Sequence, residues 1–331
     1  MKIVFMGTPD FAQKSLEAIY NAKHEILAAV TNPDKPKGRG MKMISSPVKQ
    51  FAESKNLEIY QPIKVRNNEE FINKIKSLKP DLLCVVAYGK ILPKELLDIP
   101  KYGAINVHGS LLPKYRGAAP IQWAVINGDK KTGITTMFMD IGMDTGDMIL
   151  KQEVEIGEDE TTGELWNSLS EIGANLLVKT IEKIELASKQ INEKENVLAQ
   201  IKQLIGAEKQ GDNYTMAPML EKKMAQIDWK KSAKEIHNLV RGLDPIIGAY
   251  TFYNGKKIKI WKTQIENETS DNQKEIRIEN GQVINVEKNK LTIKTGNGEI
   301  NILEIQPENK KRMPIKDFLN GTQIKQGERL G

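Results

Sequence analysis

Residues 104–117 read AINVHGSLLPKYRG, and this stretch decides the fold that we expect. Its apolar residues suit a buried strand, on which Asn106 and His108 stand two positions apart and therefore point to the same face. The turn that follows contains Gly and Pro, which mark the end of the strand. The alternative to a functional role is that His108 only forms a hydrogen bond to a neighbouring loop. Because open α/β sheets build their sites at strand ends, the amide, the imidazole and the turn together favour a functional site.

Short apolar runs alternate with helix-like stretches on both sides of this strand, as in a parallel sheet covered by helices. A helix is expected to begin at Pro9 with Thr8 as its cap. The sequence therefore predicts an α/β domain over residues 1–189, with a Rossmann-like, mostly parallel sheet and helices on both faces. Strands are expected at residues 2–6, 25–31, 58–60, 81–86, 103–108 and 133–139, and further helices at 47–55, 68–78, 120–127 and 161–189.

The turn at Gly7 lacks the further glycines that let a pyrophosphate approach the backbone. This difference from the dinucleotide-binding fingerprint argues against NAD or FAD.

The C-terminal part follows a different pattern. Residues 190–210 are rich in Lys, Glu, Gln and Asn and are predicted to be a linker. Residues 211–331 contain one expected helix, 233–241, which Gly242 should stop. Asn254-Gly255 is a strong hairpin signal between two alternating runs. Many short strands with sharp turns predict a small antiparallel β-barrel of the OB-like kind, with strands at residues 249–253, 257–261, 281–286, 291–295 and 299–305.

The net charge of +6 is concentrated in the same C-terminal part. Residues 1–210 hold 28 Lys and Arg against 27 Asp and Glu, whereas residues 211–331 hold 21 against 16. This excess suggests a polyanionic partner, and a Lys-rich solvated surface is an equally good explanation.

A second basic feature is the long loop predicted over residues 32–46. It carries four cations, Lys35, Lys37, Arg39 and Lys42, against a single acid. Loops of this length inside a compact domain are usually functional or disordered. We favour a basic finger that orders on a phosphate backbone over a loop that is merely solvated.

A second informative turn, residues 140–147, reads DIGMDTGD. It is not an EF-hand, because no Glu stands at the final position of the loop and the flanks are strands. We expect instead that Asp144, which lies on the loop proper, reaches Asn106 and His108 from a neighbouring strand end. For Asp140 and Asp147, the alternative to a role in the site is that each only stabilises the turn.

Several classes of site are not expected. Cys84 is the only cysteine and lies in an apolar run, which favours a buried filler over a nucleophile. The three histidines are far apart in sequence, without paired ligands at metal-site spacing, so we predict no metal. No segment approaches membrane-spanning length. We therefore expect a cytoplasmic protein with no membrane partner, and nothing in the sequence demands more than a monomer.

Several motifs, in the expected order, resemble those of the folate-dependent formyltransferases, and the resemblance covers nearly the whole chain. They are Gly7-Thr8-Pro9-Asp10-Phe11, Val85-Val86-Ala87-Tyr88-Gly89, Asn106-Val107-His108-Gly109-Ser110-Leu111-Leu112-Pro113, Arg116-Gly117-Ala118-Ala119-Pro120-Ile121-Gln122 and Asp144-Thr145-Gly146-Asp147. The loop from Gly38 to Lys49, together with Ile227-Asp228-Trp229 and Arg241, resembles the branch that acts on aminoacylated tRNA. One departure is Ile246-Ile247, where the family commonly carries a tryptophan.

The resemblance implies transfer of a formyl group from 10-formyltetrahydrofolate to the α-amino group of methionine on initiator methionyl-tRNA, for translation initiation. It implies that Asn106, His108 and Asp144 are the catalytic residues. The folate-binding residues would be Val86, Tyr88, Gly89, Leu92, Ser110, Leu111, Leu112, Pro113 and Asp140. The tRNA-binding residues would be Arg39, Lys37, Lys42 and Arg241.

The residue types suit this chemistry, in which negative charge develops on the formyl oxygen and the attacking amine loses a proton. Asn106 can donate an N–H to that oxygen, and such a donor typically lowers a barrier by roughly 3 kcal/mol. His108 can stabilise the same oxygen or take the proton, and Asp144 would favour the imidazolium and orient the ring.

The sequence leaves three alternatives open. A sugar-nucleotide N-formyltransferase would use the same donor, and the basic loop at residues 32–46 argues against it. An RNA-binding protein with an inactive enzyme domain would not need Asn106, His108 and Asp144. A hydrolase that releases formate from the same donor would let water replace the amine.

Overall fold

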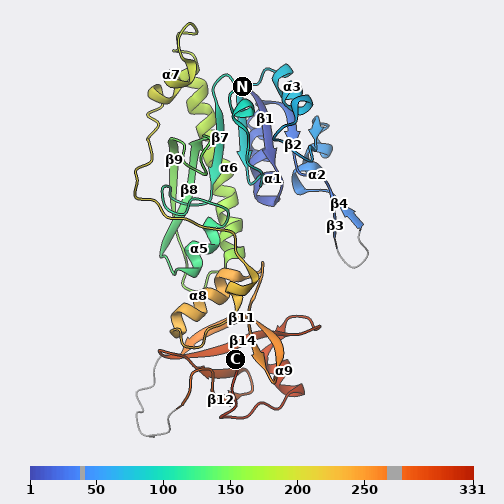
Figure 1. Ribbon diagram of the computed structural model, residues 1–331, viewed down its shortest axis with the longest axis vertical. Helices are drawn as coiled ribbons and strands as arrows, with labels where there is room; N and C mark the ends of the chain where they lie inside the picture. The colour runs from blue at the N-terminus through green and yellow to red at the C-terminus, as the bar shows by residue number, and fades with distance from the viewer. Residues whose placement is uncertain (38–41, 267–277) are drawn as a thin grey trace. The chain divides into compact units, whose positions relative to one another are not determined.

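The computed structural model describes residues 1–37, 42–266 and 278–331. By contacts, the chain divides into two compact units (Figure 1). Unit 1 comprises Met1–Pro120, Lys131–Glu155 and Trp166–Pro218, and unit 2 comprises Ile121–Lys130, Ile156–Leu165 and Met219–Gly331. The boundaries predicted at residues 189 and 211 differ from this division, because residues 190–218 pack on unit 1.

Unit 1 is built on a seven-stranded sheet in the order β5-β2-β1-β6-β7-β8-β9. The five strands from β5 to β7 are parallel, whereas β8 is antiparallel to both of its neighbours. The predicted α/β class with a mostly parallel sheet is confirmed. The strands are β1 (Lys2–Gly7), β2 (Glu25–Val30), β5 (Ile59–Tyr60), β6 (Leu82–Val86), β7 (Ala104–His108), β8 (Lys131–Phe138) and β9 (Met148–Glu155), the last of which was expected only as a flank of the turn at residues 140–147, without bounds.

Helices cover both faces of this sheet. On one face, the Cα of Gly173 in α6 lies so close to β7 and α1 that a Cβ there would stand 3.1 Å from Val107 and 3.5 Å from Phe11. On the other face, Phe71 of α3 and Leu96 of α4 pack in one core with residues of β1 and β6. The helices of unit 1 are α1 (Asp10–Asn21), α2 (Pro47–Ser54), α3 (Glu69–Ser77), α4 (Lys94–Leu97), most of α6 (Thr162–Ser188) and α7 (Val197–Leu204). Helix α5 (Pro120–Ile126) belongs to unit 2 from Ile121 onward.

Two local predictions near the N-terminus and the linker need correction. Helix α1 begins at Asp10 with Pro9 as its N-cap, whereas the Thr8 hydroxyl accepts a hydrogen bond from Asn32 Nδ2 at 2.9 Å. The predicted linker contains helix α7, which Lys202 ties to Asp147 through an ion pair of 2.9 Å.

The described residues between 32 and 46 include two short paired strands, so the segment is not wholly an open loop. Strand β3 (Lys35–Lys37) pairs antiparallel with β4 (Lys42–Ile44), with Lys37 opposite Lys42. The base of the hairpin is fastened by an ion pair of 2.6 Å between Lys49 and Asp34. Arg39 lies outside the described residues, so the prediction made for it stays a prediction.

Unit 2 contains an antiparallel sheet in the order β10-β11-β14-β13-β12, with β15 paired to β14. The antiparallel arrangement was predicted, but among the described strands β10 and β12 are the open ends of the path, so the barrel is not closed. The elements are η1 (Lys222–Ala225), α8 (Ala233–Leu243), β10 (Ala249–Tyr253), β11 (Lys256–Glu266), β12 (Val283–Glu287), β13 (Lys290–Lys294), β14 (Glu299–Pro307), β15 (Met313–Pro314) and α9 (Ile315–Gly321).

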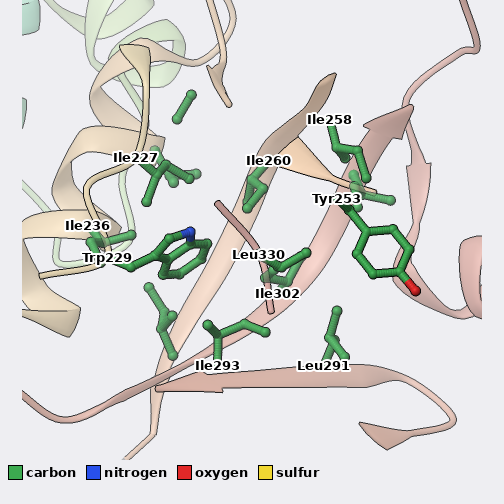
Figure 2. Packing of buried hydrophobic residues seen from close by; sticks show 14 of the residues in the cluster. Ile227, Trp229, Ile236, Tyr253, Ile258, Ile260, Leu291, Ile293, Ile302 and Leu330 are labelled. Carbon is green, nitrogen blue, oxygen red and sulfur yellow. The ribbon is translucent and has the colours of Figure 1, made fainter. Parts of the chain in front are cut away.

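The core of unit 2 gathers around Trp229, whose ring is buried and whose Nε1 donates to Thr251 at 3.1 Å. Figure 2 shows isoleucines of β11, β13 and β14 and Leu330 of the chain end in the same cluster. Helix α8 adds Ile236 and begins at a capping box formed by Ser232 and Glu235. Gly242 does not stop this helix, because it lies inside it and allows a close approach to Ile126.

Candidate active site

His108 is the last residue of β7 and is 5% exposed. Its Nε2 lies 2.8 Å from the backbone oxygen of Tyr115. Because a carbonyl oxygen only accepts, Nε2 must carry the hydrogen and donate it. The other ring nitrogen, Nδ1, is left facing the carboxylate of Asp144, with 3.6 Å between Nδ1 and Oδ2. The ring is therefore fixed in orientation and tautomer, with Nδ1 available for chemistry.

Asp144 reaches His108 by a path that differs from the predicted one. Because β8 is antiparallel to β7, the loop after β8 starts beside the beginning of β7, where Met139 N donates to Ala104 O at 2.8 Å. The loop must therefore run back along β7. It holds Asp144 at a φ of +53°, and the Asp144 carboxylate accepts a hydrogen bond of 2.9 Å from Gly117 N.

Asn106 lies two residues before His108, opposite Met137 of β8. Its neighbour Ala104 belongs to the core on the α3 side of the sheet, so Asn106 and His108 point to that side as well. The side chain is half-buried, and within the described part of the chain its amide makes no hydrogen bond. This amide can therefore donate to a ligand without first breaking a bond.

The predicted folate-binding residues form two segments, one after β6 and one after β7. Most of their side chains are fully or nearly buried, so that these residues would offer a ligand mainly their backbone groups; the buried ones are Val86, Tyr88, Leu92, Ser110 and Leu112. Leu111 and Pro113 are half-buried, and Asp140 is exposed. Gly89 has a φ of +75°, and a Cβ there would contact nothing within 4 Å.

Tyr88 is the most unusual member of this set. Its backbone oxygen accepts from Asn32 Nδ2 at 2.8 Å, and its hydroxyl is buried without a partner among the described residues. Burial raises the pKa of Tyr88 to about 12. The hydroxyl is therefore neutral at ordinary pH.

The turn after His108 is anchored by Thr135, which the sequence did not single out. Its hydroxyl donates to Ser110 O at 2.7 Å and accepts from Leu112 N at 3.0 Å. Leu112 packs beside Met137, the partner of Asn106. This turn is thus tied to β8, on the side where Asn106 points.

A second set that sequence reasoning missed comes from the segment between α7 and unit 2. Gln210 donates to the backbone oxygen of Asp144, and Thr215 accepts at its hydroxyl from Tyr115 N at 2.8 Å. Arg116 is buried and donates through Nε to Gln210 at 2.9 Å. Because Gln210 and Thr215 lie about a hundred positions after Tyr115, no local pattern indicated them.

Of the predicted tRNA-binding residues, Lys37 and Lys42 belong to the β3–β4 hairpin. Arg241 was expected at the RNA surface, and the structure corrects this prediction. It is 6% exposed and its guanidinium donates to the backbone oxygens of Gly157 and Glu160 at 3.1 and 2.9 Å. Burial lowers the pKa of Arg241. The side chain therefore braces residues 157–160.

Cys84 is fully buried, and burial raises the pKa of its thiol, as expected for a structural residue. Within the described ranges, no group of three His, Cys, Asp or Glu side chains is arranged to hold a metal ion. No described helix is both long and apolar enough to span a membrane.

Comparison with known proteins gives two kinds of match. Residues 1–181 match the family model described as formyl transferase, and residues 219–323 match that of the formyl transferase C-terminal domain. The methionyl-tRNA formyltransferase of Acetivibrio thermocellus is 48% identical over 331 residues, with 100% of both chains covered. The enzyme of that name from Clostridioides difficile is 49% identical over 333 residues, also with 100% of both chains covered.

Solved structures share the fold at lower identity. An N-formyltransferase from Helicobacter canadensis, in complex with folinic acid and dTDP-3-aminofucose, has a TM-score of 0.65 at 19% identity and covers 93% of this chain and 99% of its own. HypX from Aquifex aeolicus, in complex with tetrahydrofolic acid, has a TM-score of 0.63 at 15% identity, covering 96% of this chain and 47% of its own. By family model and full-length identity, this chain belongs to the methionyl-tRNA formyltransferase family.

Proposed function

We propose that this protein transfers the formyl group of 10-formyltetrahydrofolate to the α-amino group of initiator methionyl-tRNA. The observation that carries the proposal is the convergence of Asn106, His108 and Asp144, with His108 Nδ1 3.6 Å from Asp144 Oδ2. The acceptor is supported by the full-length identity of 48–49% to enzymes named for methionyl-tRNA. Sugar N-formyltransferases share the fold at about half that identity or less, for example at 19%.

Asn106 would bind the formyl oxygen. The amine adds to the formyl carbon, and the oxygen then takes up negative charge that a neutral N–H donor stabilises. Since the Asn106 amide has no partner within the described residues, it needs no rearrangement to donate. Donors that are already placed in this way are worth far more than those that must be reoriented during the reaction.

His108 and Asp144 would handle the positive charge. The Nε2–H is held by Tyr115 O, so the proton that the amine loses can enter only at Nδ1, the atom that faces Asp144. The resulting imidazolium lies beside a carboxylate, which lowers the energy of the cation. The proton can then pass to the departing folate nitrogen, while the Gly117 N–H keeps Asp144 in place.

The donor would lie along the segments after β6 and β7. The buried side chains of Leu92 and Leu112 would form an apolar wall of the folate site. Backbone N–H and C=O groups of these segments would then make the polar contacts to the pterin ring. A folate donor is supported by the tetrahydrofolic acid and folinic acid held in structures of the same fold.

The tRNA would contact cations in both units. In unit 1, the β3–β4 hairpin carries Lys35, Lys37 and Lys42 on a base fastened by Asp34 and Lys49. These lysines would neutralise phosphates of the acceptor end. Arg39, between Lys37 and Lys42 in the sequence, is part of this proposal by its sequence position only.

Unit 2 offers a basic face formed by Lys222, Lys257 and Lys259 around Tyr250. Lys257 Nζ lies 3.5 Å from the centre of the Tyr250 ring. Burial and the nearby charges of Lys257 and Lys222 lower the pKa of Lys259. Lys257 and Lys259 stand two residues apart on β11, and Lys259 lies opposite Tyr250 of β10, so both lysines and Tyr250 share one face of the sheet. Cations interleaved with an aromatic ring suit a nucleic acid, because phosphates and bases can both be bound.

The direct test mixes the purified protein with 10-formyltetrahydrofolate and methionine-charged initiator tRNA. We expect N-formylmethionyl-tRNA, and no product with uncharged tRNA. A dTDP-linked amino sugar replaces the charged tRNA in a parallel reaction, and faster formylation of the sugar would overturn the proposed acceptor. Release of formate without any acceptor would identify a hydrolase.

A further inference from the structure

Gln210 joins the two backbone segments that flank His108 and Asp144. Its Nε2 donates to Asp144 O at 2.7 Å and to Gly146 O at 2.8 Å. Its Oε1 accepts from the Nε of Arg116 at 2.9 Å. One side chain thus connects the loop that carries the carboxylate to the segment that carries Tyr115 O and Gly117 N.

A primary amide suits this place because it has two N–H groups and an acceptor oxygen on one planar group. All three are used here, and each partner is of the matching kind. A glutamate of the same shape would turn oxygen toward two carbonyl oxygens. An alanine would leave both carbonyls and the buried guanidinium of Arg116 without these partners.

Each of the two connected segments contains a non-glycine residue with a left-handed backbone conformation. Asp144 has a φ of +53° and Tyr115 a φ of +62°, and residues with a Cβ rarely adopt this left-handed conformation without support. Without a restraint, the Asp144 loop would relax to other conformations and carry the carboxylate away from His108.

Backbone pairing fixes Gln210 on both sides. Glu208 and Met148 exchange two hydrogen bonds of 2.8 Å, which attaches the segment to the start of β9. Further along, Arg116 N donates to Thr215 O at 2.8 Å. Gln210 therefore projects from a stretch that is tied to the sheet before it and to the loop after it.

We propose that Gln210 is a positioning residue for formyl transfer. It holds the loop of residues 140–147, which carries Asp144, to the segment of residues 115–117, and so places Asp144 against His108. The inference rests on the proposed function, since it assigns a role to Gln210 in that reaction. Gln210 acts through Asp144 and does not itself touch the reacting atoms.

The test compares Gln210→Ala and Gln210→Glu with Gln200→Ala. Gln200 is a matched control, because its amide also bonds backbone groups, donating to Asn192 O at 2.9 Å and accepting from Asn192 N at 2.8 Å, and it contacts neither loop. For both Gln210 variants we expect kcat to fall on the order of 10- to 100-fold. The KM for methionyl-tRNA should stay within about twofold, because the proposed RNA contacts lie elsewhere.

A double-mutant cycle shows whether the effect passes through Asp144. In single-turnover reactions with excess enzyme, adding Gln210→Ala to Asp144→Ala should lower the rate by less than about twofold, because the group that Gln210 positions is already absent. A full additional loss in this background would show that Gln210 does not act through Asp144 and would overturn the proposal. So would a wild-type kcat for both Gln210 variants, or an equal loss in Gln200→Ala.

Hydrogen exchange at the Gly117 amide separates this proposal from the proposed function. The amide donates to Asp144 Oδ2, so it reports the position of the carboxylate without any turnover. We expect exchange about tenfold faster or more in Gln210→Ala, and no change in Gln200→Ala. If the wild-type protein formylates no tRNA, the proposed function fails. Unchanged exchange at the Gly117 amide in Gln210→Ala would still show that Gln210 does not hold Asp144 in place.

Discussion

Replacing Asp144 with Asn removes one negative charge from the site and changes little else. The amide oxygen of the new side chain can still accept the hydrogen bond that Gly117 N now donates at 2.9 Å. The shape of the loop is kept, and Gln210 still holds the backbone oxygen of residue 144. The substitution therefore measures what the charge contributes to the reaction, separately from the contacts that hold the loop.

The size of the effect follows from the distance between the two groups. Unit charges 3.6 Å apart attract by about 4.6 kcal/mol at an effective dielectric constant of about 20, and by about 2.3 kcal/mol at about 40. The Asp144 side chain is 18% exposed and His108 5%, so water screens the pair only in part. If the imidazolium forms in the transition state, Asp144→Asn should lower kcat by about 50-fold to about 2,000-fold.

Single-turnover formylation of methionyl-tRNA measures this loss, with Asp147→Asn as the control. Asp147 lies on the same loop but pairs with Lys202 at 2.9 Å, so its loss should change the rate by less than about twofold. An Asp144→Asn enzyme within about threefold of the wild-type rate would refute the reasoning. Asp144 would then serve only as the acceptor for the Gly117 amide.

Four further outcomes are expected. Asn106→Ala should lower kcat by about 10²- to 10³-fold without shifting the urea midpoint, because its amide has no hydrogen bond to lose among the described residues. Arg241→Ala should lower the free energy of unfolding by about 2 kcal/mol in urea titrations, since two backbone oxygens lose their donor, and should leave the salt dependence of tRNA binding unchanged. Lys257→Ala should weaken tRNA binding and reduce the slope of log K against log salt by about 1, measured by filter binding or anisotropy. Hydrogen bonds from the Ser232 backbone, the Ser232 hydroxyl and Lys231 lower the pKa of Glu235 to about 2 from its ordinary 4.5. The stability that Glu235 contributes is therefore complete above pH 4.5 and is lost as the pH falls toward 2. Glu235→Gln should make the free energy of unfolding depend less on pH in that range.

The parts of the fold that the sequence predicted are those with a strong local signal. The buried runs of β1, β6 and β7 were recognised because hydrophobic side chains on both faces are characteristic of central parallel strands. Strand β9 was given no bounds because it is an edge strand, whose pattern from Lys151 to Glu155 is mostly exposed and polar. Long helices such as α6 were found within one residue at each end.

Arg241 shows why surface residues are harder to assign. A basic side chain in the last turn of an amphipathic helix usually faces solvent and offsets the helix dipole. Its burial depends on the backbone of residues 157–160, which lie more than eighty positions earlier in the chain. The same limit applies to Gln210, which is 66 residues from Asp144 and lies in a segment whose composition is that of a linker.

The two interpretations of His108 turn out to be parts of one arrangement. A hydrogen bond from the imidazole to a neighbouring loop was the structural alternative to catalysis, and the structure contains that bond, from Nε2 to Tyr115 O at 2.8 Å. This bond assigns the proton to Nε2 and leaves Nδ1 facing Asp144. Tyr115 is itself held by Thr215, which continues the segment that bears Gln210. The segment after α7 therefore sets both the tautomer of the base and the position of its carboxylate, so that a change in this segment should alter the chemical step before it alters substrate binding.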